Sequence, residues 1–143
     1  MALHPKENEN MPVYTCTLAQ GTLSTEAKSD LAGEITTIHS TVNHVPGHYV
    51  NVVFNELPPT DVFTGGQPGR PLIINGWVRT GHPDEETSQL VRGIADAATR
   101  VTGVPAERVL VVIENSPAHH AIEAGRVLPE PGQEHTWLAA GGS

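Results

Sequence analysis

This chain has 143 residues, and several of its side chains could take part in chemistry. For most of them, residue type and spacing alone do not indicate a functional site. His119, His120 and His135 have no ligand spacing on a defined face, and no carboxylate or cysteine pattern accompanies them, so no zinc site is predicted. Cys16 is the single cysteine, which excludes an intrachain disulfide or thiolate cluster and favours a small buried hydrophobe. The glycines between residues 65 and 69 indicate a turn, because neither a helix nor a P-loop lysine follows them. We therefore expect neither a metal nor a cofactor.

Three further side chains are chemically capable but individually uninformative. His39 follows Ile35 by four residues on a helical pattern, which by itself favours a core-edge histidine donating to a backbone carbonyl. The guanidinium of Arg79 can bind both oxygens of a carboxylate, although a lone arginine is more often a solvated charge. Glu123, in an expected turn or short helix, is by itself a solvated carboxylate. Their joint action depends on the elements that carry them.

The elements that must position these residues form an internal repeat. Sliding the sequence on itself gives an offset of 59 residues, at which matches occur in unbroken order at apolar and turn positions. The offset pairs Pro12 with Pro71, Leu31 with Leu90, Ile35 with Ile94, Val50 with Val109 and Val52 with Val111. The sequence thus predicts one domain over 12–143, built from pseudo-repeats 12–70 and 71–143 and preceded by a polar extension, 1–11.

Hydrophobic periodicity predicts one strand–helix–strand unit in each copy. In the first copy, a strand is expected at 13–18, a helix along the stripe 27–42 and a strand at 50–54. In the second copy, the expected ranges are 72–78, 83–102 and 109–113. Long crossovers make the strands of each unit parallel, so we expect an α/β (α+β) fold with a four-stranded, mainly parallel sheet and two helices on one face. The uncovered face predicts an oligomer.

Composition excludes several classes of partner. The net charge of −8 argues against a general nucleic-acid or anionic-membrane surface. The longest apolar run, Val109–Ile113, is far shorter than the ~20 residues of a membrane helix. The first ten residues lack the apolar core of a signal peptide, so a cytoplasmic protein is expected.

Several segments give the chain a family resemblance. They are the opening Pro12-Val-Tyr14, the stretch 62–66 (Val-Phe-Thr-Gly-Gly), and the stretch 123–132, which contains Gly-Arg-Val-Leu-Pro-Glu-Pro-Gly and is followed by Trp137. With the duplicated unit, they make the chain resemble the tautomerase superfamily, and within it the branch of the cis-3-chloroacrylic acid dehalogenases. The resemblance extends from Pro12 to about Trp137. It implies the fold predicted above and, for fused chains of this length, a homotrimer.

The resemblance also implies roles for individual residues. Pro12 matches the amino-terminal proline that is the catalytic acid or base, while His39 and Arg79 match residues that bind a substrate carboxylate. Glu123 matches the carboxylate that activates water in the dehalogenases. A terminal proline is a secondary amine, and an α-amino group titrates near pH ~7.7–8.0. Partial burial and a nearby arginine lower that pKa, so the free base can accept a proton at neutral pH.

This chemistry requires a free amine, whereas eleven residues precede Pro12 in the sequence. An internal proline has an amide nitrogen without a basic lone pair. Met11 stands directly before Pro12, where an initiator methionine would be removed. The hypothesis is that translation begins at Met11 and that the mature enzyme begins at Pro12.

Two positions depart from the dehalogenase pattern. His82 replaces a second substrate-binding arginine, and Val112 replaces a tyrosine that assists the water. His82 can substitute when protonated or as a neutral donor. Because water activation is weakened, we expect tautomerisation of small 2-oxo or enol carboxylic acids before water addition to unsaturated or halogenated acids. A third alternative is a non-catalytic trimer, if Pro12 stays internal.

Overall fold

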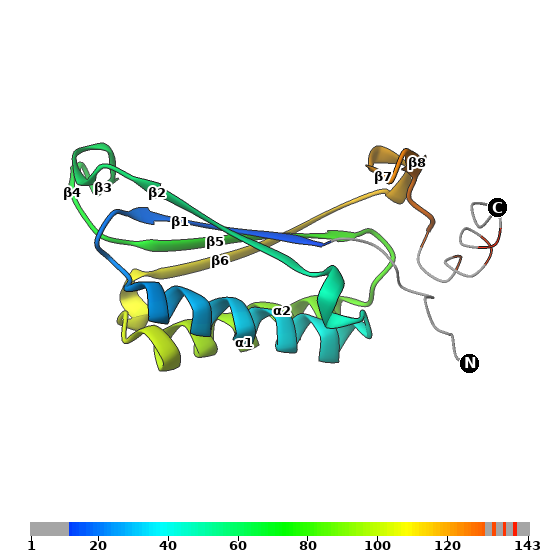
Figure 1. Cartoon of the computed structure of the whole chain (residues 1–143), viewed down its shortest axis with the longest axis horizontal. Coiled ribbons are helices and arrows are strands. Elements are labelled where there is room, and N and C mark those ends of the chain that lie inside the picture. The colour runs from blue at the N-terminus through cyan, green and yellow to red at the C-terminus, as the bar shows by residue number, and fades with distance from the viewer. Residues whose placement is uncertain (1–11, 131–132, 134–135, 137–138, 140–143) are drawn as a thin grey trace.

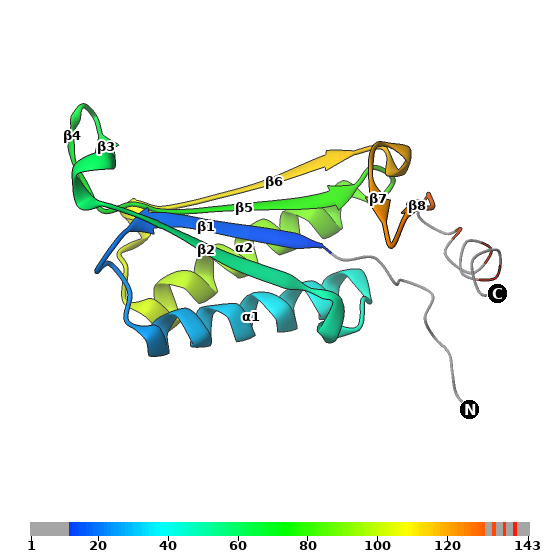
Figure 2. The same cartoon turned by 45° about the horizontal axis from the view of Figure 1, so that its top comes forward.

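The structure is a computed structural model that describes residues 12–130, 133, 136 and 139. The extension 1–11 and Trp137 lie outside these residues. Figures 1 and 2 show a twisted sheet with two helices side by side across one of its faces. The main elements are β1 (Val13–Ala19), α1 (Thr25–Asn43), β2 (Asn51–Leu57), β5 (Leu72–Arg79), α2 (Asp84–Thr102) and β6 (Val109–Ser116). The predicted strand–helix–strand units are confirmed, with boundaries shifted by a few residues.

Local signals explain where the helices begin and end. The side chain of Ser24 caps α1 by accepting a hydrogen bond from the Ala27 amide at 3.0 Å. Pro83 is the N-cap of α2, and three acidic residues follow it in the first turn, where they oppose the helix dipole. Gly103 ends α2 in the left-handed conformation (φ 80°), which glycine adopts without steric cost.

The sheet has the strand order β2-β1-β5-β6. Each helix crosses between parallel neighbours, β1 with β2 and β5 with β6, because a crossover returns the chain to the same end of the sheet. The two units join through β1 and β5, which pair antiparallel. The core lies between the helices and the sheet and is mainly aliphatic. Its buried members include Leu18, Leu31, Ile35, Leu72, Ile74 and Ile94.

Two short hairpins, which the periodicity did not predict, project from the ends of the sheet. β3 (Phe63–Thr64) pairs with β4 (Gln67–Pro68), and β7 (Ile122–Glu123) pairs with β8 (Arg126–Val127). The glycine-rich turn expected from the sequence is confirmed at the tip of the first hairpin, where Gly65 and Gly66 have positive φ. Figure 1 shows the hairpins at opposite ends of the molecule.

The crossovers of the two copies differ in length by one residue. Val13 lies opposite Asn51, 38 residues later, whereas Leu72 lies opposite Val109, 37 residues later. The helices keep the offset of 59, since they begin at Thr25 and Asp84. The second strands keep it as well, with Val50, Val52 and Phe54 packed like Val109, Val111 and Ile113. The first strands are therefore displaced by 60 residues.

This shift changes the structural counterpart of Pro12. The constant offset of 59 pairs Pro12 with Pro71, but the register and the buried faces pair it with Leu72. Tyr14, Cys16 and Leu18 are buried in β1 as Ile74, Gly76 and Val78 are in β5. A one-residue difference moves a strand residue to the opposite face, so the two prolines do not occupy equivalent environments.

The face of the sheet away from the helices, which we call the open face, exposes aliphatic side chains. Val13, Val53 and Leu110 are 42%, 50% and 52% exposed, and Ile122 on β7 is 70% exposed. Such a concentration of apolar surface is typical of a protein–protein interface. No helix among the described residues has the length and apolar character needed to cross a bilayer.

Candidate functional site

Pro12 lies buried at the start of β1, at one end of the sheet. Its carbonyl oxygen accepts a hydrogen bond from the backbone N–H of Asn51 at 2.8 Å, which ties it to the first residue of β2. The β1–β5 register, with Tyr14 opposite Gly76, places Pro12 opposite Val78 when continued by two pairs. In Figures 1 and 2 the β7–β8 hairpin lies beyond this same end. The start of β1, the end of β5 and this hairpin therefore delimit the candidate site.

On the helix side of this end, β1 and α1 bring together Tyr14 and His39. Tyr14 lies on the same face of β1 as Pro12, because side chains two residues apart share a face. The Tyr14 hydroxyl and His39 Nδ1 are 2.7 Å apart, and the rings meet edge to face with centroids at 5.5 Å. His39 is 1% exposed. Its Nδ1 partner is thus a side chain, rather than the backbone carbonyl considered from the sequence.

His82, in the turn between β5 and α2, is the second histidine of this side. Burial, and to a smaller extent the charge of a protonated His82, lower the pKa of His39 to about 4. His82 is half-buried, and its Nδ1 lies 3.4 Å from Glu86 Oε1. The structure therefore brings His39 and His82 within electrostatic reach, and it makes His39 a neutral hydrogen-bonding group at neutral pH.

Arg79 ends β5 on the opposite side of the sheet from His39. It alternates with the helix-facing Val78, and its side chain is 1% exposed. Its Nη1 donates to the carbonyl oxygen of Pro129, in the segment after β8, at 2.7 Å. Burial of a permanent cation is costly unless it is well paired, so Arg79 is not a solvated surface charge.

Glu123 lies on β7, half-buried, at a cavity of about 330 Å³ on the open face. The cavity is lined by Val13, Asn51, Trp77, Ala121, Ile122, Glu123 and Leu128. It therefore touches the residue after Pro12 and the residue that holds the Pro12 carbonyl. Sequence reasoning missed Trp77, whose Nε1 donates to Ser116 Oγ at 2.5 Å. Alternation along β5 could have placed it on the open face beside Arg79.

The structure thus places the predicted residues in two groups at one end of the sheet. His39 and His82 lie on the helix side, Arg79 and Glu123 on the open-face side, and Pro12 at the edge between them. Val112, which replaces the expected tyrosine, lies on β6 opposite Asn75. That is three residues from the pair nearest Pro12, or about 10 Å along the strand.

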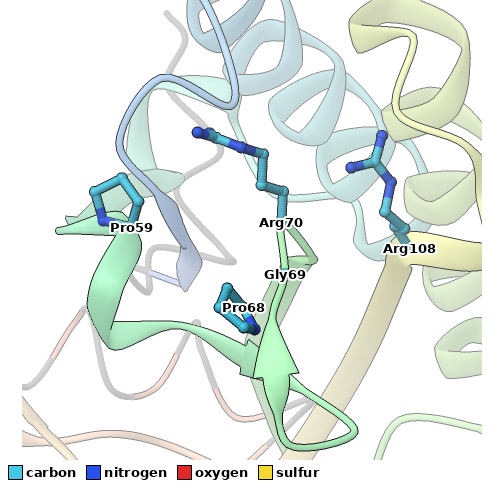
Figure 3. Close-up of a pocket in the computed structure, with 5 residues that line it drawn as sticks. All are labelled: Pro59, Pro68, Gly69, Arg70 and Arg108. Carbon is cyan, nitrogen blue, oxygen red and sulfur yellow. The ribbon is translucent and has the colours of Figure 1, made fainter.

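A larger hollow of about 420 Å³ lies at the other end of the sheet. Figure 3 shows its lining residues Pro59, Pro68, Gly69, Arg70 and Arg108. Arg70 is held there, its Nη1 donating to the Gln20 carbonyl at 3.1 Å and to Thr22 Oγ1 at 3.3 Å. Its lining contains no side chain that exchanges a proton near neutral pH, so size alone does not make it the candidate active site.

The remaining candidates behave as structural residues. Cys16 is buried, as predicted, and burial raises the pKa of its thiol to about 12. His44, His48, His119 and His120 are exposed, and His135 lies outside the described residues. Within the described part of the chain, no three His, Cys, Asp or Glu side chains are grouped so as to hold a metal ion.

Known proteins share this fold and sequence pattern. Residues 11–141 match a family described as "Putative oxalocrotonate tautomerase enzyme". The chain belongs to this family. The crystal structure of native Ps01740 is 40% identical, with a TM-score of 0.75 over 78% of this chain and 99% of that one. The structure of N1, described as a member of the cis-3-chloroacrylic acid dehalogenase (cis-CaaD) family, is 28% identical, with a TM-score of 0.81 over 89% and 90%.

A fused 4-OT described as an asymmetric trimer is 21% identical and shares the fold, with a TM-score of 0.76 over 80% of this chain and 94% of that one. No curated protein sequence matches the chain. The family and its structural relatives confirm the resemblance to the tautomerase superfamily and its dehalogenase-like branch.

Proposed function

We propose that the protein is a tautomerase-type enzyme that uses an amino-terminal Pro12 to transfer a proton on small 2-oxo or enol carboxylic acids. One observation carries the proposal. Pro12 is buried at the end of the sheet where Tyr14 and His39 meet on one side and Arg79 and Glu123 lie on the other. A site of this kind offers a base, neutral donors and a permanent cation within one short stretch of the fold.

The reaction assigns a separate task to each group. The free-base nitrogen of Pro12 accepts the enol O–H proton, the C–O bond becomes a carbonyl, and C3 takes a proton from protonated Pro12. The guanidinium of Arg79 pairs with the substrate carboxylate through its fork of donors. His39 donates to a substrate oxygen as a neutral imidazole, and His82 donates a hydrogen bond to the substrate carboxylate. Burial of Pro12 lowers the pKa of a free amine there, so the nitrogen is unprotonated and able to accept a proton near neutral pH.

We further propose that the active form is a homotrimer. The aliphatic side chains of the open face, among them Val53 and Leu110, are half exposed in one chain. Fused 4-OT, which shares this fold, is described as a trimer. A trimer that buries the open face would also enclose the cavity beside Glu123 and Trp77. Because water would then be excluded, electrostatic interactions inside the cavity would be stronger.

Water addition to an unsaturated or halogenated acid is the second candidate. Glu123 lines the cavity next to Val13 and Trp77, a position from which a carboxylate can activate water. The relative N1 is described as a member of the dehalogenase family. Val112 and His82 stand where the dehalogenase pattern has a tyrosine and an arginine, so we rank this reaction below tautomerisation.

A direct experiment uses three proteins: the chain beginning at Pro12, its Pro12→Ala variant and the form beginning at Met1. Tautomerisation of phenylenolpyruvate and halide release from 3-chloroacrylates are measured for each. We expect activity only in the first, with a loss of about 10²–10⁴-fold in the other two, the usual contribution of general acid–base catalysis. Pro71→Ala is the matched control and should retain full activity.

Equal activity in the three proteins would exclude the proline mechanism. Halide release as fast as tautomerisation would instead favour water addition. If the intact mass from the native host includes residues 1–11, the third alternative, a non-catalytic family member, replaces the enzyme.

A further inference from the structure

The contact between Tyr14 and His39 also indicates which of the two side chains donates the proton. Each phenol carries one proton to donate, and burial raises the pKa of Tyr14 above its ordinary value, so the phenol stays protonated. Among described residues the Tyr14 hydroxyl has one hydrogen-bond partner, His39 Nδ1 at 2.7 Å. A buried phenol that donates its proton to this nitrogen satisfies both atoms.

The second ring nitrogen of His39, Nε2, must then carry the proton of the neutral ring. His39 Nε2 is buried and makes no hydrogen bond to any residue that the structure describes. If Nδ1 accepts, a neutral imidazole must carry its proton on Nε2. A buried N–H left without an acceptor costs about 1–3 kcal/mol, so a ligand oxygen that supplies one is favoured.

The second copy supplies an internal contrast. The counterpart of Tyr14, 60 residues later on β5, is Ile74, and the counterpart of His39, 59 residues later on α2, is Ala98. Both counterparts are buried apolar residues that complete the core. Packing at this position therefore does not require a polar pair, and the first copy maintains one at the end of the sheet that holds Pro12.

We infer that Tyr14 is a positioning residue that fixes His39 in the Nε2–H tautomer, so that Nε2 donates to an oxygen of a small 2-oxo carboxylate. The inference rests on the proposed function for the identity of the ligand. His39 then acts as a neutral donor, leaving the charge of the carboxylate to Arg79. The groups around the imidazole are Tyr14 on β1, His82 in the turn before α2 and, through His82, Glu86 on α2.

The tautomer is measured first, by two-bond ¹H–¹⁵N NMR of the histidine rings in the chain beginning at Pro12. We expect His39 to show the pattern of Nε2–H in wild type and a mixture of tautomers in Tyr14→Phe. Tyr49→Phe, at the other tyrosine of the chain, is the matched control and should leave the pattern unchanged. A wild-type ring protonated on Nδ1 overturns the inference.

Ligand contact is measured second, by titrating pyruvate as the probe and following the Nε2–H signal. We expect a downfield shift at saturation and a roughly fivefold weaker Kd in Tyr14→Phe, the value of about one neutral hydrogen bond. In turnover, KM should rise by a similar factor, with a smaller change in kcat. An Nε2–H signal that does not respond to saturating pyruvate rejects the donor role. Both NMR readouts are independent of turnover, so an inactive protein would overturn the proposed function and still decide this inference.

Discussion

The two copies of the unit have almost the same backbone and very different chemistry. The helices, the second strands and the hairpins all recur at 59 residues, and the first strands at 60. Yet Tyr14 and His39 in the first copy correspond to Ile74 and Ala98 in the second. The comparison teaches that the repeat determines the scaffold, while a few substitutions in equivalent places give the two copies different functional groups.

The two hairpins, at opposite ends of the sheet, also share a backbone arrangement and differ in their side chains. Glu123 on β7 occupies the position of Thr64 on β3, and only the second hairpin brings a carboxylate to the cavity near Pro12. The first hairpin instead borders the hollow that contains Arg70 and Arg108. Each end therefore has a hairpin, a hollow and a cation, and Pro12, the proposed amine, lies at the end with the β7–β8 hairpin.

The largest contrast between the copies should be visible in the pH dependence of stability. The pKa of His39 is lowered to about 4 from an unfolded value of 6.5. Below pH 6.5 the unfolded chain binds a proton that the folded chain does not. The free energy of unfolding therefore decreases as the pH is lowered, until the folded pKa is reached. The loss is about 3 kcal/mol between pH 7 and pH 4. Urea unfolding at both pH values measures it.

The control for this prediction is a pair of variants. His39→Gln should remove most of the pH-dependent difference, whereas His48→Gln, at an exposed histidine, should preserve it. An identical pH dependence in His39→Gln and wild type would show that His39 does not titrate abnormally.

The two arginines sharpen the comparison between the ends of the sheet. Arg79→Gln should lower kcat/KM for an enol carboxylate by about 10–100-fold, the value of a charged hydrogen bond to the carboxylate. Arg70→Gln should change it less than about twofold, because Arg70 lies at the hollow away from Pro12. Thermal unfolding of both variants tests whether Arg79→Gln keeps the fold. Similar losses in both variants would place the carboxylate elsewhere.

The smallest effect concerns the packing of Tyr14. A Cβ added at Gly76 would contact Tyr14 and lie 2.8 Å from the Cδ1 of Ile113, so Gly76→Ala should destabilise the fold by about 1–3 kcal/mol through overpacking. Its counterpart in the first strand is Cys16, where the same replacement by alanine removes only a sulfur and should cost about 1 kcal/mol. Denaturant unfolding of the two variants compares them. A neutral Gly76→Ala would mean that the Tyr14 ring has room to move.

Periodic and local signals predicted most of the fold. The alternation at 13–18 and the stripe at 27–42 predicted β1 and α1, because burying one face of an element imposes its period on the sequence. For the hairpins at the sheet ends, the sequence predicted only a turn, at the glycines of the first hairpin. Two-residue strands have too few positions to show a period. The candidate residues His39, Arg79 and Glu123 came from the family resemblance, since each alone is an ordinary core or surface residue.

The sequence by itself determined the repeated unit, the elements and the parallel strand pairs, because these depend on period and turn chemistry along the chain. Its motifs gave the candidate residues through the family resemblance. Only the tertiary structure decided that Pro12 corresponds to Leu72, because a one-residue difference in crossover length changes which face a side chain occupies. It also paired Tyr14 with His39, 25 residues apart, and buried Arg79 against Pro129, 50 residues away. These contacts depend on how a strand, a helix and a returning segment pack together, and no spacing along the chain encodes that.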